Sequence, residues 1–171
     1  YDFAHDKLRE VTYNSLSAAH RHLLHRCVAE AMVALYASQN STTPPGRLDT
    51  AHRQIATHFE MAGLFENAVP HYLQAAEDAQ RLYANVEAIN CYRHALALLE
   101  GPIAGVSTQI ANLGETLGDL LSLTSQYEEA RTHYLRAMTQ HKLLERIDRA
   151  RLQRKIGNTW REQYEYQQAR Q

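Results

Sequence analysis

Three eight-residue stretches of this chain follow one pattern: AVPHYLQA at residues 68–75, AINCYRHA at 88–95 and ARTHYLRA at 130–137. Each reads Ala-x3-Tyr-x2-Ala, and a fourth copy begins at Ala169. Because positions i, i+4 and i+7 share one face of an α-helix, each copy places a tyrosine between two small residues on that face. A recurring face of this kind is typical of stacked helical hairpins, so the pattern predicts an all-α protein built from helical repeats.

The residues ahead of the later copies predict the other helix of each hairpin. Leu117-Gly118 precedes the third copy, and Ile156-Gly157 precedes the fourth. Gly114 lies four residues before Gly118, a spacing that indicates close packing against another helix. The intervals between the first alanines of the copies are 20, 42 and 39 residues, so we expect an atypical unit in the middle of the array.

The composition excludes several classes of protein. The formal net charge of the 171 residues is -1, which argues against a dedicated nucleic-acid-binding domain. No apolar run approaches the roughly 20 residues that a membrane span needs. Cys27 and Cys91 are far apart and both lie on predicted apolar helix faces, so we expect no disulfide. We therefore expect a soluble, cytoplasmic protein that does not contact a membrane.

Helical spacing and chain breakers give a helix map. The polar run at residues 38–46 ends in Pro-Pro-Gly, which predicts a linker, and Gly101–Gly105 predicts a second break. Ser17 is a candidate cap for a long helix. The apolar stripe expected on that helix comprises Leu24, Cys27, Val28, Ala31, Met32 and Leu35. The other helices are expected at about 3–15, 49–62, 66–82, 85–99, 108–123, 126–142 and 145–163, with a last one starting near Tyr166.

The histidines and glycines do not form a recognisable chemical motif. His20, His22 and His25 are close in sequence, but His20 and His22 point to different sides of a helix, and no further ligand completes a zinc site. No phosphate-binding glycine loop is present. We predict no catalytic residue, no metal site and no cofactor. The histidines beside repeat aromatics are expected to be partly buried packing residues: His58, His71, His94 and His133.

Basic residues gather near the end of the chain, and they have two interpretations. Contact with nucleic-acid phosphates is one. The other, which we prefer because the whole chain is nearly neutral, is a solvated helix with i, i+4 charge pairs or a face that meets an acidic partner. The basic residues concerned are Lys142, Arg146, Arg149, Arg151, Arg154, Lys155 and Arg161.

Residues 113–130 resemble the tetratricopeptide repeat, through Leu117-Gly118 and the Tyr127-x2-Ala130 that follows. Residues 55–68 and 156–169 show similar arrangements, the latter with Trp160 in the aromatic slot. The resemblance implies a right-handed superhelix of hairpins, an α-solenoid, over residues 49–171 with the last repeat truncated. It also implies an inner face that binds a protein or peptide, and the matching positions are Arg53, Thr57, Glu60, Glu115, Asp119, Ser122, Arg154, Asn158 and Arg161.

The first part of the chain carries a second resemblance. Residues 3–16 and 21–31 are similar to the junction that follows the ATPase core in bacterial STAND-type signalling ATPases and transcriptional regulators. This implies that residues 1–36 are the end of a winged-helix-like segment with its exit helix, and that 37–48 is a linker. The chain would then be a fragment of a larger protein, a non-catalytic interaction or sensor module whose partner can be another domain of the same polypeptide. The alternative is a free-standing adaptor that scaffolds other proteins.

Overall fold

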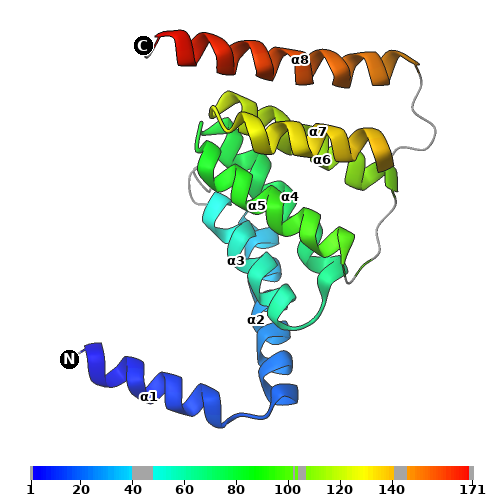
Figure 1. The fold of residues 1–171 in the computed structure, drawn as a ribbon. Helices are drawn as coiled ribbons and strands as arrows, with labels where there is room; N and C mark the ends of the chain where they lie inside the picture. The colour runs from blue at the N-terminus through cyan, green and yellow to red at the C-terminus, as the bar shows by residue number, and fades with distance from the viewer. Residues whose placement is uncertain (1, 40–47, 102, 104–106, 141–145, 170–171) are drawn as a thin grey trace. The chain divides into compact units, whose positions relative to one another are not determined.

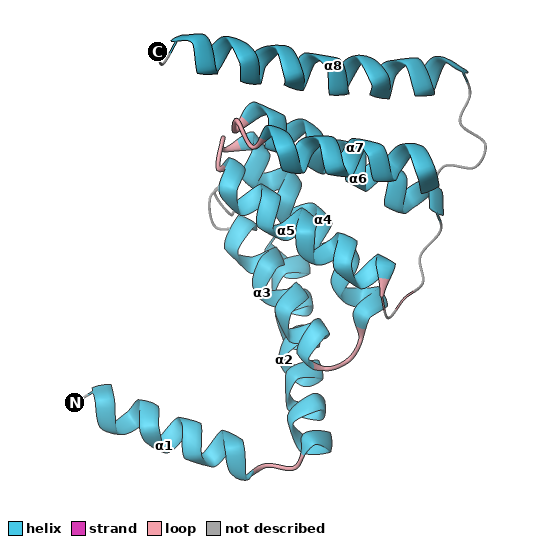
Figure 2. Ribbon diagram, in the orientation of Figure 1, coloured by secondary structure: helices cyan, strands magenta, loops and turns pink. Residues whose placement is uncertain are grey.

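The computed structural model describes residues 2–39, 48–101, 103, 107–140 and 146–169, and the regular structure in these residues is entirely α-helical (Figures 1 and 2). The all-α prediction is therefore confirmed. The helices are α1 (Asp2–Ser15), α2 (Ala18–Gln39), α3 (Leu48–Met61), α4 (Phe65–Arg81), α5 (Asn85–Glu100), α6 (Ser107–Leu123), α7 (Tyr127–Gln140) and α8 (Arg146–Ala169).

The helix boundaries agree with the sequence map except at the end of the chain. The expected new helix near Tyr166 is wrong, because α8 continues without interruption to Ala169. The segment from Arg161 to Tyr166 contains neither glycine nor proline and consists of residues that a helix tolerates, so nothing in it stops the helix. Most of the predicted linker, at 40–47, lies outside the described residues.

The chain divides into two compact units, residues 1–75 and residues 76–171, and the boundary falls within α4. We call them unit 1 and unit 2 and describe each by itself. Unit 1 contains α1, α2, α3 and the first part of α4. Unit 2 contains the rest of α4 and the helices α5 to α8.

In unit 1, α2 packs against α3. Ser17 caps α2 as predicted, since its Oγ accepts a hydrogen bond from the His20 N–H at 3.3 Å. Among the α2 side chains whose burial is described, Ala29 is completely buried, whereas the predicted stripe is largely exposed. Cys27 lies on this apolar stripe as predicted, and the structure shows that it is exposed. The apolar residues of α2 lie on one face of the helix at the predicted spacing, but no described part of unit 1 packs over most of this face.

Three turns between consecutive helices have the same backbone geometry. They follow α3, α4 and α6, and each has one residue in the left-handed region: Gly63 (φ 73°), Tyr83 (φ 58°) and Ser125 (φ 62°). In each turn this residue donates its N–H to the carbonyl three residues earlier, and the next residue donates to the carbonyl five residues earlier, at 2.8–3.0 Å. This is the Schellman motif, which satisfies the last carbonyls of a helix. The sequence repeat therefore has a counterpart in a repeated backbone turn.

The signature tyrosines bond to the helix that precedes them. The hydroxyl of Tyr72 donates to Glu60 at 2.5 Å, and the hydroxyl of Tyr92 donates to Gln80 at 2.8 Å. The hydroxyl of Tyr134 donates to Asp119, also at 2.8 Å. All three rings are buried between the small residues of the signature. Each copy thus fixes one helix against the previous one through an aromatic ring and one directed hydrogen bond.

At Gly118, α6 lies against the ring of Tyr134 of α7. A Cβ added at Gly118 would lie 2.6 Å from the ring of Tyr134, so only glycine leaves room for the ring. Gly114, one turn earlier, faces the α7 backbone at His133, and a Cβ there would have an ordinary contact of 3.8 Å. The predicted close packing is confirmed at Gly118, whereas the packing at Gly114 leaves room for an alanine.

We expect Gly118→Ala to destabilise the protein by about 1–3 kcal/mol, because the overpacking against Tyr134 exceeds the gain in helix propensity. Gly157→Ala is the matched control, since it changes the corresponding glycine of α8, where an added Cβ meets nothing within 4 Å. This variant should be more stable than the wild type by roughly 0.5–1 kcal/mol. Urea unfolding of the three proteins checks both signs, and equal effects of the two substitutions would contradict the packing described.

Candidate interaction surface

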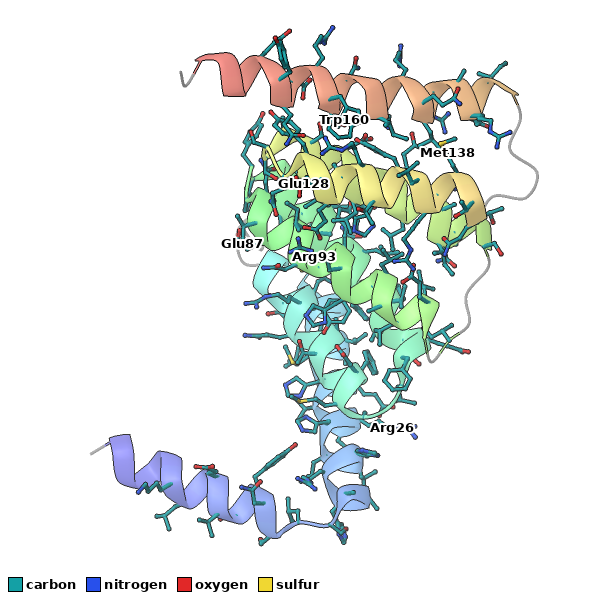
Figure 3. All side chains as sticks on the ribbon, in the orientation of Figure 1. Arg26, Glu87, Arg93, Glu128, Met138 and Trp160 are labelled. Carbon is teal, nitrogen blue, oxygen red and sulfur yellow. The ribbon has the colours of Figure 1, made fainter. Side chains whose placement is uncertain are left out.

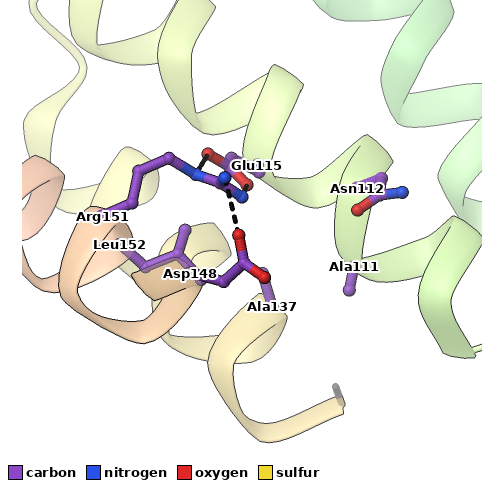
Figure 4. A pocket seen from close by; sticks show the side chains of 7 residues that line it. All are labelled: Ala111, Asn112, Glu115, Ala137, Asp148, Arg151 and Leu152. Atoms are coloured by element: carbon purple, nitrogen blue, oxygen red, sulfur yellow. Dashed lines mark hydrogen bonds and ion pairs between the residues drawn. The ribbon is translucent and has the colours of Figure 1, made fainter. Parts of the chain in front are cut away.

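Helices α6 and α8 are joined by a cluster of charged side chains (Figure 4). The Glu115 carboxylate accepts two hydrogen bonds from the Arg151 guanidinium, both at 3.0 Å, and lies 2.7 Å from Lys155 Nζ. Lys155 also contacts Asp119 at 2.6 Å. Arg151 in turn reaches Asp148 of its own helix at 2.7 Å. The cluster is partly shielded, because the Glu115 side chain is 15% exposed.

The helical repeat explains why these four groups meet. Glu115 and Asp119 are four residues apart on α6, and Arg151 and Lys155 are four apart on α8, so each pair shares one helix face. In both acid–base pairs the partners are 36 residues apart in sequence. Two acidic residues on one helix therefore oppose two basic residues on a helix that is not its neighbour in sequence.

The electrostatic environment of the cluster favours the charged form of Glu115. Burial alone would raise the pKa of its carboxyl group, but the hydrogen bonds from Arg151 and Lys155 and their positive charges outweigh burial and lower this pKa. Tyr134 adjoins the cluster through Asp119. Its burial and that hydrogen bond raise the pKa of the phenol above its usual range, so the hydroxyl remains a donor.

A second set of ion pairs with the same separation joins α5 to α7. Arg93, labelled in Figure 3, forms a two-pronged contact with Glu129, with a shortest distance of 2.7 Å. Arg136 reaches Glu100 at 2.7 Å. Each helix supplies one basic and one acidic residue: Arg93 and Glu100 come from α5, and Glu129 and Arg136 come from α7. Such pairs fix the register of the two helices more than they stabilise them.

Two clefts of unit 2 differ from typical ligand sites. One has a volume of about 90 Å³ and is lined by residues of α6, α7 and α8 that include the Glu115–Arg151 pair (Figure 4). The other, of about 340 Å³, is open to solvent and lies at the turn between α6 and α7, where Gln163 of α8 adds to its wall. Small-molecule sites measure about 300–1,000 Å³ and enclose most of the ligand surface. The first cleft is too small and the second is too open, so the surfaces of the helices are the better candidates for binding.

The predicted inner-face residues of unit 2 differ in their surroundings. Glu115 and Asp119 are engaged in the cluster with α8, whereas Arg154, Asn158 and Arg161 are exposed on α8. Sequence reasoning selected the two acids and missed their partners, Arg151 and Lys155, as site residues. The signal for these partners is the recurring separation of 36 residues between groups of opposite charge. Ser122 is half-buried at the end of α6.

The predicted inner-face residues of unit 1 lie on α3. Arg53 is exposed. Thr57 lies 3.4 Å from the Tyr72 hydroxyl, and Glu60 accepts the hydrogen bond from that hydroxyl. Thus Thr57 and Glu60 correspond in role to Asp119 of unit 2, because they surround the hydroxyl of a signature tyrosine.

Histidines form two hydrogen-bonded pairs in unit 1. His25 of α2 and His58 of α3 are 2.8 Å apart at their Nδ1 atoms, and His25 Nε2 lies 2.8 Å from the Tyr13 hydroxyl. His52 and His71 are 3.1 Å apart at Nδ1. Within the described residues, no group of three or more His, Cys, Asp or Glu could hold a metal ion.

The histidine environments bear on the sequence interpretation. His58, His71 and His133 are partly buried as predicted, whereas His94 is exposed, so the packing role expected for it is wrong. Burial, and next the neighbouring His58, lower the pKa of His25. Burial and then His52 lower the pKa of His71. The neutral forms of His25 and His71 are therefore favoured in the folded protein.

Part of the chain is similar to a curated protein of unknown function. A 98-residue stretch that covers 57% of this chain is 34% identical to an uncharacterized protein of Rhizobium meliloti (strain 1021). The stretch makes up 9% of that protein, so the chain spans about a tenth of the length of this curated relative. No known protein family and no solved structure matches the chain. Among the described helices, none is long and apolar enough to cross a membrane.

We expect Glu115→Gln to lower the free energy of unfolding by about 0.5–1.5 kcal/mol near neutral pH, because Arg151 and Lys155 lose a shielded carboxylate, although they keep Asp148 and Asp119 as partners. The pKa of Glu115 is lowered on folding, so its contribution is present above the ordinary value of 4.5 and is lost as the pH falls through the folded pKa. Chemical unfolding at several pH values checks this. Glu165→Gln, in an exposed ion pair, should change stability by less than about 0.5 kcal/mol, and an equal loss in both variants would refute the assignment.

We expect unit 1 to become less stable as the pH falls below the ordinary histidine pKa of 6.5, because the folded-state pKa values of His25 and His71 are lowered. The unfolded chain then binds more protons than the folded chain. His71→Phe, which keeps a ring stacked on Phe59, should make the stability less dependent on pH, because one of the two histidines no longer takes up a proton on unfolding. Unfolding curves at pH values of about 7.5 and about 5 measure the difference, and an unchanged dependence would exclude His71 as a source.

Proposed function

We propose that this chain is a non-catalytic protein-interaction or sensor module, built of tetratricopeptide-like hairpins stacked as an α-solenoid. The observation that supports it best is the repetition of one hairpin design. The same turn recurs after α3, α4 and α6, and the signature tyrosine that follows each of these turns bonds back to the preceding helix. Repeated hairpins of this kind present extended surfaces, and their use in proteins is mainly the binding of peptides and helices.

The place of the module in a larger protein is the second part of the proposal. The similarity of residues 3–31 to the segment after a STAND-type ATPase core supports an arm of a signalling ATPase or transcriptional regulator. The relative from Rhizobium meliloti is also far longer than the matched stretch. In this arrangement, the module binds a partner or restrains the ATPase domain until a signal arrives. Exposed Arg154, Asn158 and Arg161 of α8 are candidates for that contact.

A free-standing adaptor is the alternative function. The paired charges of α5 with α7 and of α6 with α8 support a stiff scaffold in either case, so the structure of unit 2 fits both functions. The two hypotheses differ in what surrounds the module: the regulatory hypothesis requires an ATPase domain in the same polypeptide, and the adaptor hypothesis does not. Experiment can test this difference.

We expect the native reading frame to encode a P-loop nucleotide-binding domain before Tyr1 and further residues after Gln171. Sequencing the gene in both directions measures this directly. A start codon immediately before Tyr1 would overturn the regulatory proposal and leave the adaptor. If a P-loop domain is found, the double variant Arg154→Glu, Arg161→Glu should raise basal nucleotide hydrolysis of the intact protein, whereas exposed Glu87→Lys on α5 should not (Figure 3).

A further inference from the structure

Helix α3 is joined to both of its neighbours in unit 1 by a pair of histidines. His58 of α3 meets His25 of α2, with 2.8 Å between their Nδ1 atoms. His52 of α3 meets His71 of α4, with 3.1 Å between the same atoms. The ring centres are 5.1 Å apart in the first pair and 5.4 Å apart in the second. The placement of α3 therefore depends on two contacts between imidazole groups.

Each pair keeps its hydrogen bond only while one of the two facing nitrogens lacks a proton. A neutral imidazole carries hydrogen on one ring nitrogen and accepts at the other, whereas an imidazolium carries hydrogen on both. The bond is therefore compatible with no added proton or with one. A second proton would set two cationic N–H groups against each other at 2.8–3.1 Å, where repulsion and the lost bond oppose it. The closed pair thus holds at most one proton.

The titratable and charged groups that face the His25–His58 pair do not offset a second proton. Burial, then His58 and then His22 of the same helix lower the pKa of His25. From α1, the Tyr13 hydroxyl lies 2.8 Å from His25 Nε2. The Arg21 guanidinium of α2 lies 5.4 Å from the centre of the Tyr13 ring. These neighbours are neutral or cationic, so they do not stabilise a doubly charged pair.

The His52–His71 pair also lacks an opposite charge. Phe59 of α3 stacks on His71, with ring centres 5.7 Å apart, and burial and then His52 lower the pKa of His71. The Glu60 carboxylate of α3 accepts its hydrogen bond from the Tyr72 hydroxyl. Among the described residues, neither histidine pair forms an ion pair with a carboxylate.

Proton counting gives the direction and the size of the effect. The closed pairs hold at most one proton each, whereas separated imidazoles each hold a proton well below their ordinary pKa of 6.5. The state that binds more protons gains population as the pH falls. From about pH 7.5 to about pH 5, this favours the open state about tenfold for one pair and about a hundredfold for both.

We propose that the two histidine pairs form a pH-dependent clamp that releases α3 from α2 and α4 in acid, as a local opening of unit 1. The inference rests on the proposed function and adds a regulation of the same module, because α3 carries Arg53, Thr57 and Glu60, which are expected to face a partner. Opening displaces these residues and uncovers Ile55 and Phe59, which are buried in the closed state. A partner that binds the closed state is therefore bound more weakly in acid.

The test measures amide hydrogen exchange in the full chain at about pH 7.5 and about pH 5, with rates corrected for the intrinsic effect of pH on exchange. The protection of α3 should fall about a hundredfold relative to that of α6, a helix of unit 2 that contains no histidine. Unchanged protection of α3 would show that the rings turn into solvent without release of the helix. An equal fall in α3 and α6 would show global unfolding, and either result would overturn the proposal.

Variants of the clamp test each pair by itself. In His52→Gln and in His58→Gln, the glutamine can still bond to the remaining imidazole but takes up no proton. Each variant should reduce the pH-dependent fall to about tenfold, and the double variant should remove it. His94→Gln, at an exposed position of α5, is the matched control and should behave as the wild type does. A wild-type pH dependence in either single variant would contradict the clamp, so the test does not require the double variant to fold.

The clamp and the proposed function can fail separately. The exchange experiment uses the free chain without a partner, so its result does not depend on whether a P-loop domain precedes Tyr1. Failure of the clamp would leave an interaction module that lacks this regulation. Conversely, a start codon immediately before Tyr1 would exclude the regulatory arm and leave the acid opening of α3 unaffected.

Discussion

The hairpins depend on one contact, the packing of a tyrosine ring against the preceding helix. In unit 2, the ring of Tyr134 occupies the space above Gly118 and its hydroxyl bonds to Asp119. The glycine at position 118 and the tyrosine at position 134 are therefore required together, because the ring fits only where no side chain is present. This requirement fixes the distance between α6 and α7, because the ring allows neither closer approach nor separation without loss of the hydrogen bond.

Charge then sets how successive hairpins align. Asp119 accepts from Tyr134 on one side and contacts Lys155 on the other, so one carboxylate belongs both to the hairpin and to the contact with the next helix. The interaction module that we propose follows from this combination. Rigid hairpins hold their surfaces in a fixed arrangement, and a surface that is fixed before binding loses less entropy when a partner docks.

Much of the fold was accessible from sequence because it depends on local signals. The signature positions, the glycine at 118 and the breaks between helices specified an all-α chain with nearly correct boundaries. Prediction from the repeat pattern failed near Tyr166. The pattern predicted a turn and a new helix there, but the residues between Arg161 and Tyr166 are compatible with a continuous helix, and α8 runs through them. A repeated pattern indicates what a segment resembles, whereas the local residues decide whether the helix ends. The candidate site was less accessible, since the pairing of Glu115 and Asp119 with Arg151 and Lys155 requires knowing that α6 and α8 lie side by side.

The ion pairs between α6 and α8 have a consequence for how unit 2 comes apart. A helix that contacts a single neighbour can separate at the cost of one interface. Here α8 contacts both α7 and, through Glu115 and Asp119, the helix before it. Detachment of α8 therefore takes both cations away from the carboxylates of α6, although Asp119 keeps its hydrogen bond from Tyr134. α8 is thereby tied to both helices of the preceding hairpin, and amide exchange in α8 and α6 would follow a common opening event.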